Sequence, residues 1–224
     1  MPVSGFSFSH AVHAICARRA GTIDVESVHA MLGLATLPVA SPAATDWLSW
    51  MGFGRDFGLM AFATCFDLEV RPLHPANAGV ALTSSPEFQQ HFDASYVPLI
   101  ETALAADQAV LAWGHWEGHR DLEWGVIHER HTGEAGGYAG DVMSSVDDQF
   151  VSDRTQLIRP PTMVYVVDTS HQIADVPVAS GLRLMVGNAL RGLTDPALAG
   201  GGILFGADAV AYWSEQFKRR ALAD

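Results

Sequence analysis

Apolar and polar residues alternate most regularly in the middle of the chain, where segments of strand length follow one another. Five segments have the composition and the bounding residues of strands. They are Leu68–Leu73, Ala109–Trp116, Glu123–His131, Gly136–Asp141 and Thr162–Asp168. The first is stopped by His74-Pro75, because the residue before a proline is restricted. A run of nearly consecutive strands of this kind predicts a mainly antiparallel sheet.

Helical spacing of apolar residues dominates on both sides of these strands. The predicted helices are Phe8–Ala20, Thr22–Leu34, Asp46–Phe53, Met60–Phe66, Pro86–Phe92, Val97–Ala106, Val176–Leu193 and Gly206–Leu222. The polar segment Val142–Ile158 is expected to be a long loop or a short helix. Strands grouped between helical segments favour an α+β fold over a wound parallel sheet. We expect residues 1–170 to form this domain, with residues 171–224 as a C-terminal helical extension packed on it.

Composition and charge narrow the possible partners. The formal net charge of −12 argues against nucleic acid and against anionic membrane as binding partners. Two cysteines give no disulfide framework and are compatible with a reducing cytosol. The first residues, MPVSGFSFSHAV, lack the basic and apolar regions of a signal peptide. A soluble, cytoplasmic protein is therefore expected.

The order of elements resembles a known superfamily. The first helix ends in glycine, and a short second helix follows it. The AVLAWG strand (109–114), the WGVI strand (124–127), a Gly-Tyr strand and a strand after Pro160-Pro161 come later. This order resembles the papain-like domains of bacteriocin-processing peptidases and of butirosin-type acyltransferases, over roughly residues 5–168. The segment FGADAVAYWSEQF (205–217) also resembles the helix that follows such domains in the acyltransferases. The resemblance implies a papain-like fold with an N-terminal helical lobe.

The resemblance also implies where catalytic residues would lie. These families use a cysteine at the start of the first helix, a histidine opening the second central strand and an Asp or Asn on the next strand. The corresponding positions here are Ser7–Ser9, Glu123 and Asp141, so two of the three carry another residue type. We therefore expect a catalytically degenerate protein that binds a peptide or acyl-peptide in bacterial peptide natural-product biosynthesis, with a biosynthetic enzyme as possible partner. The expected ligand-binding residues are Ser9, His13, Trp113, Trp116, Glu123 and Trp124.

An active enzyme is the alternative. It would be an acyl transferase, peptidase or cyclase in which Cys16 or an N-terminal serine is the nucleophile and a relocated histidine is the base. The catalytic residues would then be Cys16, His10, His128 and Asp141. Against this, Cys16 lies among apolar residues, where a thiol is more often a small core residue.

The histidine pairs 115/119 and 128/131 have spacings that are found among metal ligands, so we considered a metal site. On a strand, however, His128 and His131 point to opposite faces and need a bulge to chelate together. We therefore expect no metal and no cofactor. A homodimer stays possible, because the C-terminal helices can pack on their own domain or on a second subunit.

Overall fold

The chain divides into two compact units. The computed structural model describes residues 7–20, 23–33, 39–40, 57–73, 86–118, 122–130, 137–146, 149–161, 163–168, 178–194 and 204–221. The first unit contains Met1–Val25 and Phe66–Asp175, and the second contains Glu26–Cys65 and Val176–Asp224. This grouping joins residues 26–65, which we expected in the sheet domain, to the C-terminal helices. The expected packing of those helices on the sheet domain stays a prediction, and each unit is described by itself.

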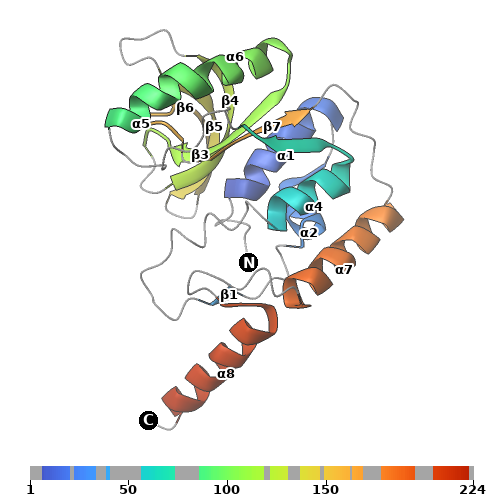
Figure 1. Cartoon of the computed structure of the whole chain (residues 1–224). Helices are drawn as coiled ribbons and strands as arrows, with labels where there is room; N and C mark the ends of the chain where they lie inside the picture. The colour runs from blue at the N-terminus through green and yellow to red at the C-terminus, as the bar shows by residue number, and fades with distance from the viewer. Residues whose placement is uncertain are drawn as a thin grey trace. The chain divides into compact units, whose positions relative to one another are not determined.

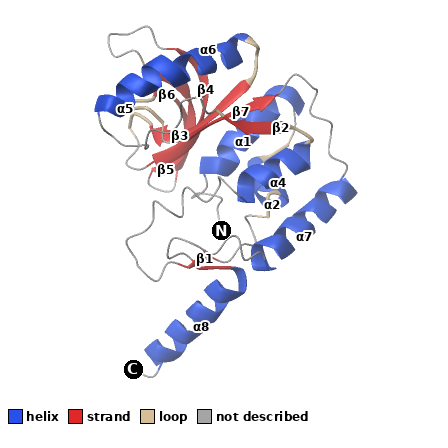
Figure 2. Ribbon diagram, viewed as in Figure 1, coloured by secondary structure: helices blue, strands red, loops and turns tan. Residues whose placement is uncertain are grey.

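A six-stranded antiparallel sheet forms the centre of the first unit (Figure 2). Its order is β2-β7-β3-β4-β5-β6, and each neighbouring pair is antiparallel. The strands are β2 (Glu69–Pro72), β3 (Ala109–His115), β4 (Leu122–Arg130), β5 (Tyr138–Val146), β6 (Gln149–Gln156) and β7 (Met163–Asp168). The α+β class predicted from the sequence is confirmed.

Helices cover the two faces of this sheet (Figure 1). On one face lie α5 (Pro86–His91), the π-helix η3 (Phe92–Tyr96) and α6 (Val97–Ala105). Their apolar residues share a buried core with Val110, Ala112 and Ile127 of β3 and β4. The other face is covered at β4 and β5 by α1 (Ser7–Ala20), whose Phe8 ring lies 5.2 Å from the ring of Trp124. Because side chains alternate along a strand, Trp124 and Ile127 point to opposite faces.

Trp116 packs against the backbone of two neighbouring strands on the α6 face. The side chain is fully buried and belongs to the same core as Ile100 and Ile127. A Cβ atom at Gly125 would lie 2.5 Å from Cζ2 of this indole, and one at Gly140 would lie 2.8 Å from its Cη2. Contacts this short cannot be relieved by a rotamer change, so both strands need glycine beneath the ring.

The segment Val142–Ile158 corrects one of our expectations. We predicted a loop or short helix, whereas the structure extends β5 to Val146 and forms β6 from Gln149 to Gln156. Among the described strands β6 pairs only with β5, so it lies at the edge of the sheet. A strand at an edge buries less apolar surface, which is why its polar sequence gives a weak strand signal.

Four helices and a short strand pair make up the described part of the second unit. They are α2 (Val25–Met31), α4 (Phe57–Phe66), α7 (Val178–Thr194), α8 (Gly206–Ala221), β1 (Val39–Ala40) and β8 (Leu204–Phe205). Val25 and Phe66, at the ends of α2 and α4, are grouped with the first unit. The predicted helix Asp46–Phe53 lies outside the described residues. Within the described residues, no helix has the length and apolar character needed to cross a bilayer.

Asn188 of α7 connects three segments inside the second unit. Its Nδ2 donates a 2.8 Å hydrogen bond to the carbonyl oxygen of Met31, at the end of α2, and lies 3.6 Å from Sγ of Cys65. Gly33 follows α2 with φ of 77°, a conformation that glycine commonly adopts just after the end of a helix. A Cβ atom there would lie 2.7 Å from Cβ of Asn188, so glycine also permits this close approach.

Tyr138 places a polar atom in the core beneath α6. The residue is 3% exposed, and its buried hydroxyl has no hydrogen-bond partner among the described residues. Burial raises the pKa of this phenol to about 12, with a further rise from Glu101 and a decrease from Arg130. An unpaired buried hydroxyl costs on the order of 1–3 kcal/mol.

We therefore expect Tyr138→Phe to raise the free energy of unfolding by about 1 kcal/mol, because it removes the unpaired group and keeps the ring. The unfolded tyrosine ionises near pH 10 and the folded one near 12. The wild type should therefore lose stability across this interval, and the variant should lose less. Urea unfolding at pH 7 and at pH 11 measures both effects, with Tyr212→Phe on α8 as control. A destabilised variant at pH 7 would contradict this account.

Candidate functional site

The peptide group between Glu123 and Trp124 is held at both ends by side chains. Its carbonyl oxygen, on Glu123, accepts a 3.1 Å hydrogen bond from Nε1 of Trp116. Its N–H, on Trp124, donates a 3.0 Å hydrogen bond to Oγ of Ser7. Ser7 is the first residue of α1, so the start of this helix lies beside the start of β4. These are the elements at which the resemblance expects a nucleophile and a base.

Neither Ser7 nor Glu123 is open to solvent. Ser7 is 6% exposed and Glu123 is 9% exposed. A backbone N–H is a donor only, so it orients the Ser7 hydroxyl oxygen but cannot accept the hydroxyl proton. The hydrogen bond between Ser7 and Trp124 therefore holds the backbone in place, which is a structural role.

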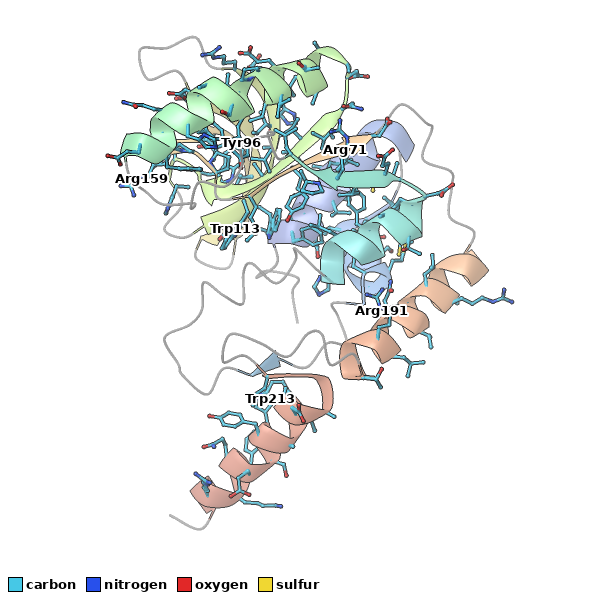
Figure 3. All side chains as sticks on the ribbon, viewed as in Figure 1. Arg71, Tyr96, Trp113, Arg159, Arg191 and Trp213 are labelled. Carbon is cyan, nitrogen blue, oxygen red and sulfur yellow. The ribbon has the colours of Figure 1, made fainter. Side chains whose placement is uncertain are left out.

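Four aromatic rings surround this point on the α1 face. The ring of Trp124 lies 5.2 Å from Phe8, 6.4 Å from Trp113 and 6.1 Å from Tyr165. Trp113 stands directly opposite Trp124 in the β3–β4 pair and is labelled in Figure 3. We call Phe8, Trp113, Trp124 and Tyr165 the aromatic cluster. Three of its members are buried, and Tyr165 is half-buried.

A second polar pair lies farther along β4. Nε2 of His128 is 2.5 Å from Oδ2 of Asp141 on β5, and the two side chains are 6% and 35% exposed. An ionised carboxylate only accepts hydrogen bonds, so Nε2 must carry the proton. Nδ1 of a neutral His128 is then an acceptor, as a general base requires. Asp141 stands opposite Val126 and therefore shares the α1 face with Trp124.

A β-bulge lies at His128, beside this pair. The register of β4 against β5 shifts between Ile127 and Glu129, which leaves His128 as the extra residue. Bulges redirect a side chain relative to the regular alternation of a strand and are frequent near active sites. The sequence argument named His128 and Asp141 together as catalytic residues of the alternative enzyme, but it did not foresee the bulge at His128.

The remaining predicted residues of α1 are interior. Ser9, His10 and Cys16 are 0%, 3% and 0% exposed. Nε2 of His13 lies 2.8 Å from the carbonyl oxygen of Ile23, to which it donates a hydrogen bond. This bond ties the middle of α1 to the segment that precedes α2. A role for Ser9 or His13 in binding a ligand stays a prediction.

The predicted tryptophans divide between the two faces. Trp113 and Trp124 belong to the aromatic cluster, whereas Trp116 lies in the core beneath α6. All three are buried, with exposed fractions of 6%, 1% and 0%. Their contact with a ligand stays a prediction. Tyr165, which we had treated only as part of a buried strand, is the most accessible ring of the cluster.

No metal site emerges from the described residues, among which no three His, Cys, Asp or Glu side chains form a suitable group. His115 is half-buried, and burial together with Arg159 lowers its pKa. His119 and His131 lie outside the described residues. The expectation that the protein holds no metal stays a prediction.

We expect Ser7→Ala to lower the free energy of unfolding by about 1–3 kcal/mol, because the variant leaves the buried N–H of Trp124 without its acceptor. Ser214→Ala on the exposed surface of α8 is the control and should change stability by less than about 0.5 kcal/mol. Denaturant unfolding followed by tryptophan fluorescence measures both. Equal stability of the two variants would show that the Ser7 hydrogen bond contributes nothing.

Comparisons with known proteins identify no relative of this chain. No protein-family model matches the chain, and neither a curated protein nor a solved structure matches it. The functional argument therefore depends on the geometry around β4.

Proposed function

We propose that this protein binds a peptide or an acyl-peptide on a papain-like scaffold and does not turn it over. The observation that carries the proposal is the hydrogen bond from Trp124 N to Ser7 Oγ. It supports placing Ser7 and Glu123 where the resembled families have a cysteine and a histidine. A role in bacterial peptide natural-product biosynthesis, beside a partner enzyme, is part of the same proposal.

The chemistry of the two residues supports binding without catalysis. A serine is a weak nucleophile unless a base lies within hydrogen-bond reach of its hydroxyl. Ser7 Oγ instead accepts a hydrogen bond from an amide. Glu123 places a carboxyl group where the resembled families have an imidazole, so this position does not supply their histidine base. In this reading, the two positions have changed from proton transfer to holding β4 against α1.

The accessible side of the aromatic cluster is the surface on which we place the ligand. Tyr165 is half-buried and lies beside Trp124, and the neighbouring Met163 on β7 is half-buried too. Aromatic rings and methionine offer large, adaptable apolar contact to the side chains or the acyl group of a peptide. We place the ligand against the Tyr165 side of the cluster.

Panning a phage-displayed random peptide library on the wild-type protein tests this proposal. We expect enrichment of apolar peptides that bind reversibly and stay intact by mass spectrometry after prolonged incubation. Tyr165→Ala should weaken their binding by about tenfold or more, as for an aromatic anchor. Leu99→Ala, on α6 over the opposite face, should leave binding unchanged. Absence of enrichment, equal effects of both variants, or cleavage of the peptide would each reject the proposal.

An acyl-transfer or peptidase activity is the second candidate, and the His128–Asp141 pair is the observation that favours it. An imidazole with a carboxylate behind its ring is the usual arrangement of a positioned base. Cys16 lies on α1, which packs on β4 and β5. Given the rise per residue of helix and strand, Cys16 is about 13 Å from Ser7, and His128 is about as far from Trp124.

Alkylation with iodoacetamide at neutral pH decides between the candidates. If His128 activates Cys16, this thiol will be modified in the native protein, and His128→Ala will slow the reaction about tenfold or more. Cys65 is an internal reference, because burial raises the pKa of its thiol to about 11 and leaves little thiolate at pH 7. If neither cysteine is modified before the protein unfolds, the hypothesis of an enzyme with a cysteine nucleophile is rejected.

A further inference from the structure

Exposed apolar side chains are concentrated on the last two helices. Eight large apolar residues are exposed in the described part of the chain, and six of them lie on α7 and α8. On α8 they are Val210, Trp213 and Phe217, with exposed fractions of 47%, 42% and 70%. Their spacing of three and four residues places them in one stripe along the helix. We call these three residues the α8 stripe; Trp213 is labelled in Figure 3.

Most residues of the helix that carries this stripe are exposed or half-exposed, as far as the structure describes them. Gly206 and Ala209, in its first turn, are the only buried residues among those of α8 whose exposure the structure describes. The helix contacts β1, β8 and α7. From Val210 to Arg219 each residue is exposed or half-exposed. Isolated helices of this length are marginal in water, and most helices gain stability by packing an apolar face.

We propose that α8 pairs in an antiparallel manner with α8 of a second copy of this chain. A twofold axis between Trp213 and Ser214 would place Val210 of each copy opposite Phe217 of the other. The two Trp213 side chains would meet at the centre. The same stripe thus provides the large Phe217 and the smaller Val210, which face each other across the axis. An isologous interface requires such a self-complementary surface. This inference does not depend on the proposed function.

Charge along the helix favours a second copy in this orientation. The first turn of α8 carries Asp208, and the last turns carry Lys218, Arg219 and Arg220. Antiparallel pairing brings each basic end beside the acidic end of the other helix, whereas parallel pairing would crowd two basic ends together. The whole chain has a formal net charge of −12. Two copies of this acidic chain repel each other electrostatically, and contact through the basic end of α8 reduces that repulsion.

The expected interface is small. A single pair of helices of this length buries less than the 1,200–2,000 Å² that is usual for stable complexes. We therefore expect a monomer–dimer equilibrium that depends on concentration, with dimers in the micromolar range and above.

Sedimentation velocity of the full chain over a wide concentration range tests the inference. The wild type should shift from the 24.0 kDa monomer toward twice that mass as concentration rises. Phe217→Glu should move the midpoint to about tenfold higher concentration or more, because it places a charge in the contact, opposite the apolar Val210 of the other copy. Ala211→Glu adds the same charge at an exposed position outside the stripe and should leave the midpoint unchanged.

Circular dichroism of both variants should match the wild type, since both positions are exposed. A wild type that stays monomeric overturns the inference, and so does a dimer that Phe217→Glu leaves intact or that both variants abolish equally. Flotation with phosphatidylcholine–phosphatidylglycerol vesicles tests the alternative that the α8 stripe binds a lipid surface. A monomeric chain that binds these vesicles through Phe217 would assign the stripe to a lipid surface and reject the second copy.

Discussion

One peptide group connects the two sides of the sheet. Trp116 holds the carbonyl of Glu123 from the α6 side, and Ser7 holds the N–H of Trp124 from the α1 side. Both bonds are buried, so each is shielded from competition with water. Because Trp116 packs on Gly125 and Gly140, the indole can reach this carbonyl only while both strands lack side chains there. The positions of α1, β4 and the aromatic cluster all depend on this arrangement.

Much of the fold could be predicted because burial and periodicity agree in its central elements. The predicted strands Ala109–Trp116 and Glu123–His131 match β3 and β4, and Phe8–Ala20 matches α1, each within one residue at either end. These elements are buried over most of their length, so the apolar pattern records their structure. β6 was not predicted, because an edge strand buries few apolar side chains and its sequence shows little apolar periodicity. The π-helix η3 was missed because its one-residue change of period is invisible in so short a segment.

The candidate site was only partly predictable, for a different reason. The order of elements was sufficient to expect Ser7 near the start of β4, because that position depends on topology. The sequence named His128 and Asp141 together as catalytic residues of the alternative enzyme, but the bulge at His128 has no signature in a two-residue period. Tyr165 was missed because its strand reads as uniformly buried, whereas the ring lies half-exposed beside Trp124. Such features follow from pairing register, which local sequence does not specify.

The two polar pairs on β4 differ in what they leave available for chemistry. Ser7 and the Glu123–Trp124 peptide group satisfy each other, so using Ser7 in a reaction would first break a buried hydrogen bond. Nε2 of His128 is bound to Asp141, and that carboxylate is 35% exposed. The start of β4 is therefore held by two buried hydrogen bonds. Any proton transfer would have to occur about 13 Å farther along the strand, at a separate place.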